Sequence, residues 1–211
     1  MMKRTLTDDE DIVCWKGKGD RFKSTFNTKE TWTAIRESKP RAEWHQGVWL
    51  NHHKPKFSFM TWLAVRNRLS TGDRMLQWNM GVNSCCVFCH APVETRNHLF
   101  FACQYSADVW TGLSRKLLSQ RFSTDWDMII KLITDTSLGK GCLFLVRYTF
   151  QLTVHSIWKE RNGHRHGEAP IPSSQLTRRL DKQTRNRISS IRELGDRRYE
   201  DYGDLVWLKI T

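Results

Sequence analysis

Long apolar runs are missing from this 211-residue chain. None approaches the roughly 18 consecutive apolar residues that are needed to cross a bilayer. The opening residues, MMKRTLTDDEDIVCW, also lack an apolar segment of the signal-peptide type. We therefore expect a soluble intracellular protein, located in the nucleus or cytoplasm, that is neither secreted nor associated with a membrane.

Acidic residues are few compared with basic ones. Lys and Arg together number 34, and Asp and Glu number 22, which gives a formal net charge of +12 and a pI of about 9.7. This excess favours phosphate-rich or otherwise acidic partners, although it carries no information about the fold. The chain also contains 10 Trp and 10 Phe residues, enough large apolar side chains for a packed core.

The spacing of apolar residues predicts a mainly α-helical fold with a small N-terminal β-hairpin. Residues 11–26 are typical of two short strands joined by a turn at residues 17–20. A helix is expected from Thr28, which could cap it, and Pro40 limits its length.

Further helices are expected along the rest of the chain. The longest regular pattern, Leu143 to Arg161, keeps apolar residues three or four apart and predicts a core helix. The other predicted helices lie after Pro55, from Asp73 to Met80, after a cap at Ser106 and after a cap at Asp125. Large aromatic residues at helical spacing, such as Trp62 and Trp110, are expected to pack in the core.

Residues 163–174, GHRHGEAPIPSS, are typical of a linker because glycine and proline cluster there. Ser173 or Ser174 could then cap a last helix that runs through Leu194 and is ended by Gly195. This helix is basic. Its positive residues form either a solvated face or a patch that contacts phosphates.

Six cysteines in a chain without a secretion signal favour metal or thiol chemistry over disulfides. Cys86, Cys89, His98 and Cys103 have the spacing C-x2-C-x8-H-x4-C, which suits a tetrahedral site for one structural Zn²⁺. Four protein ligands leave no position for a reactive water, so we do not expect hydrolytic catalysis.

Alternatives to this ligand set remain open at the level of sequence. Cys85 could replace Cys86, or His90 could replace His98, in a shifted register. The four residues could also be buried thiols and a core histidine. Cys14 and Cys142 have no nearby partner in the sequence and are interpreted as ordinary buried thiols.

A series of ordered motifs over residues 11–113 resembles the zinc-binding domain that follows the polymerase in plant non-LTR, or LINE-type, retrotransposon reverse transcriptases. The motifs are Asp11…Trp15…Phe22, Thr31-Trp32, Trp49 before Pro55-Lys56, Phe59-x2-Trp62-Leu63, Asn67-Arg68-Leu69-Ser70-Thr71, Asp73-Arg74, Cys86-x2-Cys89, Glu94-Thr95, His98-Leu99-Phe100-Phe101, Cys103, Tyr105-Ser106 and Val109-Trp110. The later segment from Ile157 to Asn162 is similar to the one that follows this domain in many plant members.

The polymerase itself is not represented, because the chain contains no Tyr-x-Asp-Asp motif. Asp8-Asp9 lies in a polar run without a strand pattern, and the Lys23-Ser24-Thr25 segment departs from the family's usual Phe-Ser-Val. We therefore assign no catalytic residues and do not expect an enzyme.

The resemblance implies an accessory module that binds RNA or DNA without sequence preference. Lys and Arg side chains would contact phosphates; the candidates are Lys54, Lys56, Arg66, Arg68, Arg74, Arg96, Arg178, Arg179 and Lys182. The alternative is a zinc-stabilised module that binds protein partners or is only a structural remnant.

Together these patterns predict four regions. The reverse transcriptase-type zinc-binding domain occupies residues 11–113, and a helical extension packs on it over residues 114–162. The linker, residues 163–174, leads to a basic C-terminal helix and tail over residues 175–211.

Overall fold

The computed structural model describes residues 10, 12–17, 19, 21–37 and 39–195. It divides into two compact units, Met1–Arg41 and Ala42–Thr211. The described part of the chain is mainly helical and contains one two-stranded hairpin, which confirms the predicted fold class. The expected region boundaries after residues 113, 162 and 174 all fall within the second unit.

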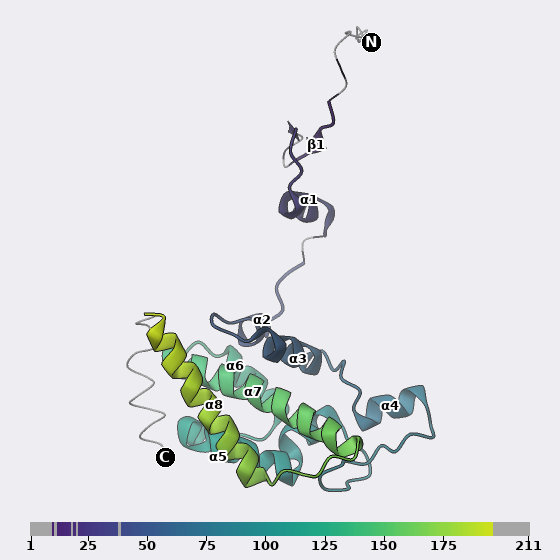
Figure 1. The fold of residues 1–211 in the computed structure, drawn as a ribbon, viewed down its shortest axis with the longest axis vertical. Helices are drawn as coiled ribbons and strands as arrows, with labels where there is room; N and C mark the ends of the chain where they lie inside the picture. Colours follow the sequence, from purple (N-terminus) through teal and green to yellow (C-terminus); the bar gives the residue numbers. More distant parts are fainter. Residues whose placement is uncertain (1–9, 11, 18, 20, 38, 196–211) are drawn as a thin grey trace. The chain divides into compact units, whose positions relative to one another are not determined.

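The first unit contains the predicted hairpin (Figure 1). Strands β1 (Trp15–Lys16) and β2 (Phe22–Lys23) run antiparallel, with Trp15 opposite Lys23. Lys18 and Asp20 of the expected turn lie outside the described residues. The side chain of Cys14 is exposed, so the expectation that it is a buried thiol is wrong.

Helix α1 (Thr28–Ile35) follows the hairpin and begins as predicted. Its N-cap is Asn27, whose Oδ1 accepts a hydrogen bond from the Glu30 N–H at 3.0 Å, so the expected cap at Thr28 is displaced by one residue. The Glu30 carboxylate pairs with Lys23 at 2.8 Å, which links the helix to β2.

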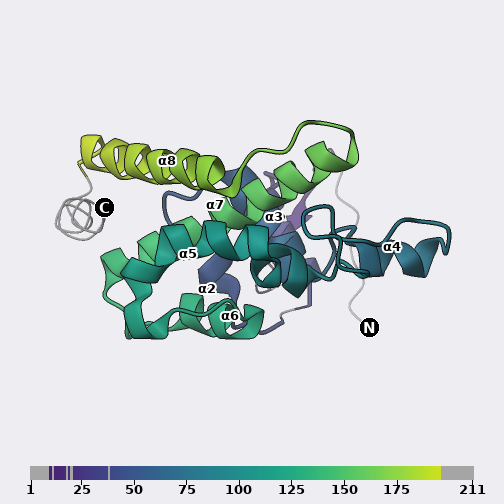
Figure 2. The same ribbon diagram turned by 90° about the horizontal axis from the view of Figure 1, so that it is seen from below.

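The second unit is built around α7 (Lys140–Arg165), a helix of 26 residues. Helices from both earlier and later parts of the chain pack against it (Figures 1 and 2). They are α2 (His45–Val48), α3 (Pro55–Val65), the π-helix η2 (His98–Ala102), α5 (Gln104–Leu118), α6 (Trp126–Thr134) and α8 (Ser173–Glu193). The short helices α4 (Gly72–Trp78) and η3 (Ser119–Arg121) complete the unit.

Aromatic residues fill the centre of this unit. The ring of Phe101 stacks on Phe150 at 5.8 Å and meets the edge of Trp110 at 5.2 Å. Trp126 lies 5.8 Å from Phe101 on another side, and all four side chains are buried. Such pairs contribute beyond the apolar area that they remove from water. Trp110 is therefore a core residue, as predicted, whereas Trp62 is only partly buried.

The helix ends show which local signals the chain uses. Asp125 caps α6 as predicted, with its Oδ1 accepting from the Met128 N–H at 2.9 Å. The expected cap at Ser106 is wrong, because α5 begins at Gln104 and Cys103 takes the N-cap position. The Ser106 hydroxyl donates instead to the Leu99 carbonyl in η2.

The core helix is longer than the pattern from Leu143 to Arg161 predicts. It continues to Arg165, so the first three residues of the expected linker are helical. The chain then turns at Gly167, whose φ of +85° favours glycine. Helix α8 begins at Ser173, but its N-cap position is Pro172 and no side chain caps it, so the expected cap at Ser173 or Ser174 is wrong. None of the described helices is both long and apolar enough to cross a membrane.

A buried polar residue joins the central helix to the start of the unit. Gln151 of α7 donates from Nε2 to the carbonyl oxygens of Gly47 and Val48, at 3.1 and 2.8 Å. Its Oε1 accepts from the Ser58 hydroxyl at 3.1 Å. Because Gln151 is fully buried, no water could form these hydrogen bonds if its side chain were lost.

Replacing this glutamine with an apolar residue should therefore be costly. We expect Gln151→Leu to lower the free energy of unfolding by about 2–4 kcal/mol, since it removes three buried hydrogen bonds. Urea denaturation followed by circular dichroism measures the change. Gln120→Leu, at an exposed position, is the matched control, and equal losses in both variants would contradict the proposed role of Gln151.

Candidate metal centre

A tight turn presents the first two cysteines. The Cys86 carbonyl accepts from the His90 N–H, and the Cys86 N–H donates to the Ala91 carbonyl, both at 2.9 Å. His90 completes the turn with a φ of +60°. This backbone geometry places the Cys86 and Cys89 side chains on the same side, as the C-x2-C spacing predicts.

The other two donors come from the junction between η2 and α5. The Cys103 N–H donates to the His98 carbonyl at 2.7 Å, closing the wide π-helical turn between them. The intervening Leu99, Phe100 and Phe101 are fully buried and fix this turn in the core. His98 and Cys103 therefore approach the cysteine turn from a rigid part of the fold.

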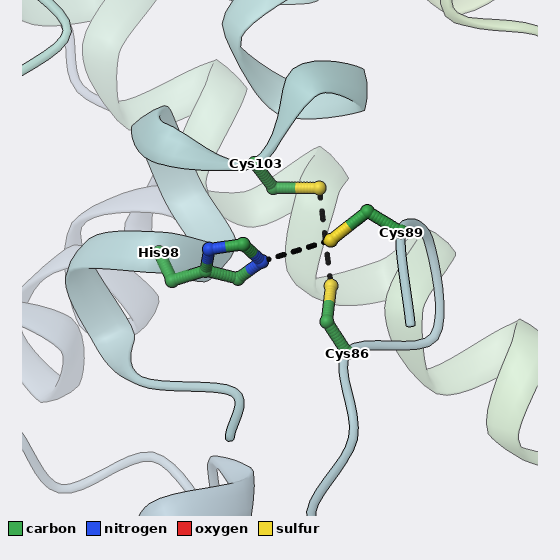
Figure 3. Close-up of side chains that lie close together, drawn as sticks. All are labelled: Cys86, Cys89, His98 and Cys103. Carbon is green, nitrogen blue, oxygen red and sulfur yellow. Dashed lines mark hydrogen bonds between the residues drawn. The ribbon is translucent and has the colours of Figure 1, made fainter. Parts of the chain in front are cut away.

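The four side chains converge on one point (Figure 3). The sulfur atoms of Cys86, Cys89 and Cys103 and a ring nitrogen of His98 all lie within 4.8 Å of one another. The sulfur atoms of Cys86 and Cys103 are 3.8 Å apart, and the Cys89 sulfur lies 3.1 Å from His98 Nε2. Sulfur atoms bound tetrahedrally to Zn²⁺ at about 2.3 Å would be separated by about 3.8 Å. The donor set and its spacing therefore fit zinc.

The hydrogen bond between Cys86 and Cys103 dominates the electrostatics of the cluster. It lowers the pKa of the Cys86 thiol to about 4, against the effect of burial and with help from the N–H groups of Cys89 and Phe88. The same hydrogen bond, together with burial, raises the pKa of Cys103. Zinc binds thiolates, so the ion replaces the shared proton when it binds.

Aromatic contacts hold the cysteine turn against the helices. The ring of Phe88, between the two cysteines, stacks on Tyr105 of α5 at 4.3 Å and meets His164 of α7 at 5.3 Å. The Tyr105 hydroxyl donates to the Ile171 carbonyl at 2.7 Å. The cluster is thus connected to both α5 and the segment that follows α7.

A buried ion pair supports the loop between the two pairs of donors. Glu94 is fully buried, and Arg161 of α7, which is 3% exposed, donates to it with a shortest distance of 2.6 Å. Arg161 also donates to the Ser70 carbonyl at 3.0 Å, and Glu94 accepts from the Gly72 N–H at 3.2 Å. Both charges therefore have several partners, as buried charges require.

The backbone is closely packed beside this ion pair. A Cβ atom at Gly72 would lie 2.2 Å from the Ser84 carbonyl oxygen, so only glycine fits there. That oxygen accepts from the Glu94 N–H at 2.8 Å. The loop that carries the cysteines is therefore fixed by α4 as well as by α7.

The alternative ligands lie outside the cluster. Among the described residues, the group of three or more potential ligands consists of Cys86, Cys89, His98 and Cys103, without Cys85 or His90. Cys142, interpreted as a buried thiol, is partly buried, and burial raises its pKa. His164, in the expected linker, lies instead in α7, 3.8 Å from Glu160.

The basic residues predicted to contact phosphates differ in their surroundings. Arg96 is engaged within the protein: its guanidinium lies 4.4 Å over Trp126 and donates to the Val65 carbonyl at 3.3 Å. Lys54 and Arg74 are partly buried. The others are exposed, namely Lys56, Arg66, Arg68, Arg178, Arg179 and Lys182.

Comparison with known families agrees with the geometry. Residues 26–110 match the family model described as zinc-binding in reverse transcriptase, and this range contains all four donors. The match confirms the resemblance to the reverse transcriptase zinc-binding domain. No curated protein and no solved structure matches the chain. The match and the donor cluster together indicate a zinc-binding module.

Removing one sulfur should release the metal. We expect Cys86→Ser and Cys103→Ser each to abolish stoichiometric zinc, measured by elemental analysis, and to unfold at much lower temperature. Structural zinc contributes about 10–16 kcal/mol of apparent binding energy, comparable to the whole stability of a domain. Cys85→Ser is the matched control and should keep its zinc. Unchanged metal content in the first two variants would refute the ligand assignment.

Breaking the buried ion pair should destabilise the whole unit. Arg161→Met leaves the Glu94 carboxylate buried without its partner, so the free energy of unfolding should fall by about 3–5 kcal/mol. Adding Glu94→Gln should recover part of this loss, because the remaining buried charge is removed. Urea denaturation measures both effects. A double variant no more stable than Arg161→Met would contradict this account; Arg121→Met, which breaks an exposed pair with Asp135, should change stability far less.

Proposed function

We propose that this protein is a non-catalytic, zinc-stabilised module that binds RNA or DNA through its phosphates, with one structural ion. The observation that carries the proposal is a basic cleft of about 240 Å³ where α3, α7 and α8 meet. Lys56, Lys159 and Arg179, one from each helix, border this cleft. We call it the basic cleft.

The basic cleft gathers positive charge from segments that lie far apart in the sequence. None of the ion pairs among the described residues involves Lys56, Lys159 or Arg179. Of the two carboxylates in the lining, Glu160 accepts from the Ile171 N–H at 2.8 Å, and Glu168 is exposed. Three cations at one opening favour a polyanion.

Other positively charged side chains lie close to Lys56 of the basic cleft. Burial lowers the pKa of Lys54, and the positive charges of Arg187 and Lys56 lower it further, which indicates that these three cations are close. His155 lies in the cleft, where burial and then Lys56 and Lys159 lower its pKa. His155 is therefore neutral at pH 7, and the lysines and arginines carry the charge.

The zinc centre supports a structural role for the ion. Three sulfurs and one imidazole fill a tetrahedral shell and leave no position for substrate or a reactive water. The family match names the zinc-binding part of reverse transcriptase and includes no polymerase. This supports an accessory module that originates from a non-LTR retrotransposon reverse transcriptase and works where nucleic acid is present, in the nucleus or cytoplasm.

Binding should depend steeply on salt. Replacing Lys56, Lys159 and Arg179 with Gln should weaken binding to a labelled 20-nucleotide RNA and reduce the slope of log K against log salt by about 2, since three phosphate contacts are lost. Fluorescence anisotropy at several salt concentrations measures both. Replacing the exposed Lys29, Lys131 and Lys140 with Gln removes the same charge elsewhere and is the control.

An equal loss of binding in both triple variants would assign binding to net charge alone. No binding by the unmodified protein at low salt would contradict nucleic-acid binding. The second result would favour a module that contacts protein partners or has only a structural role. Reversing Arg178, Arg179 and Lys182 to Glu should also weaken binding, because Arg179 borders the basic cleft.

A further inference from the structure

The segment around α3 contains no acidic residue. Between Glu43 and Asp73 the sequence has Lys54, Lys56, Arg66 and Arg68 but neither Asp nor Glu. The rest of the chain carries both signs of charge, with 30 basic and 22 acidic residues. A partner of α3 therefore meets only positive or neutral side chains from this segment, which suits a polyanion.

Helix α3 is apolar on both its buried and its outer side. Phe57, Thr61 and Ala64 face the core and are buried. On the opposite side, Phe59 is 52% exposed and Trp62 is partly exposed. Two large aromatic side chains on the outer side of the helix are therefore available to contact a partner.

The exposed rings form a row with a cation at its end. Phe59 and Trp62 lie 5.7 Å apart, with their planes inclined by 35°. The Arg66 guanidinium lies 5.8 Å from the Trp62 ring. Because these residues are spaced by three and four, the helix presents them on one face. We call this row the α3 aromatic face.

We infer that the α3 aromatic face binds unpaired bases of single-stranded nucleic acid. Phe59 and Trp62 offer surfaces on which bases stack, and Arg66 contacts a phosphate or the face of a base. Stacking needs bases that are not paired, so this face distinguishes a single strand from a duplex. The inference rests on the proposed nucleic-acid binding and specifies the form of nucleic acid that is bound.

The charge of the surrounding segment decides between occupants. A second copy of this chain or another basic protein would bring positive charge against Arg66 and Arg68. A nucleic-acid strand brings one negative charge per nucleotide together with a flat aromatic group. Among these partners, it alone complements both the rings and the cations of the α3 aromatic face.

The test compares binding of a single strand and of a duplex to the whole 211-residue chain. Phe59→Leu and Trp62→Leu keep an apolar side chain but remove the aromatic surface. Each should weaken binding to a labelled 20-nucleotide oligouridine by about 5- to 150-fold, as expected when one stacked base is lost. Affinity for a 20-base-pair RNA duplex and the salt dependence should both stay nearly unchanged, because the cations remain.

Trp78→Leu provides a matched control. Trp78 is 61% exposed on α4, and the Arg74 guanidinium lies 5.4 Å from its ring, so it repeats the pairing of an aromatic ring with arginine outside the acid-free segment. This variant should bind oligouridine like the unmodified protein. Thermal denaturation of all three variants, with unchanged zinc content, verifies that they are folded.

The outcomes separate this inference from the function on which it rests. If the unmodified protein binds both nucleic acids and the α3 variants bind oligouridine equally well, or lose the same affinity for duplex, the base-stacking role is overturned and nucleic-acid binding stands. If the unmodified protein binds neither, both are overturned. A dimer in sedimentation that Phe59→Leu disrupts would assign the face to a second copy and overturn the inference.

Discussion

Three thiolates and one imidazole can share one centre only if a positive charge offsets the repulsion between the thiolates, and these four donors lie within 4.8 Å of one another. A divalent cation does so most effectively, and the N–H groups of the cysteine turn add to the effect at Cys86. Residues 83–95 contain neither helix nor strand, so this loop has little regular structure of its own. Its shape depends on the metal cluster and on the contacts that surround it.

Helix α3 shows how one short element can serve several surfaces. One side packs on α7, Lys56 borders the basic cleft, and the side away from the core presents aromatic rings. Such a helix is apolar nearly all round, which usually indicates complete burial. Here the Arg66 guanidinium at one end of the exposed row, and the absence of acidic residues between Glu43 and Asp73 in the sequence, give the outer side a different character.

The features that sequence predicts well are local ones. The Cys86-x2-Cys89 turn and the Asp125 cap follow from spacing, because each is formed by adjacent residues. The choice of Cys86 over Cys85 and of His98 over His90 is seen only in the structure. The start of α5 at Gln104, rather than after the expected cap at Ser106, could not be predicted, since the π-helical turn η2 sets it. Charge alone did not reveal that Arg96 packs over Trp126, because a basic residue carries no local signal for its direction.

The pairing of Glu94 with Arg161 is a non-local feature that the sequence does not predict. Both residues lie within motifs that resemble the reverse transcriptase family, yet 67 positions separate them and no periodic pattern connects them. Only the packing of α7 beside the cysteine loop brings them together. The same holds for Lys159, which joins Lys56 and Arg179 in the basic cleft without any sequence signal.

Because of this ion pair, the stretch that matches the family model is shorter than the stretch that must fold together. The match ends at residue 110, whereas the partner of the buried Glu94, Arg161, lies 51 residues later on α7. A shuffling event that moved residues 26–110 alone into another protein would carry a buried carboxylate without its counter-ion. Inheritance of this domain in working form therefore requires the central helix to travel with it.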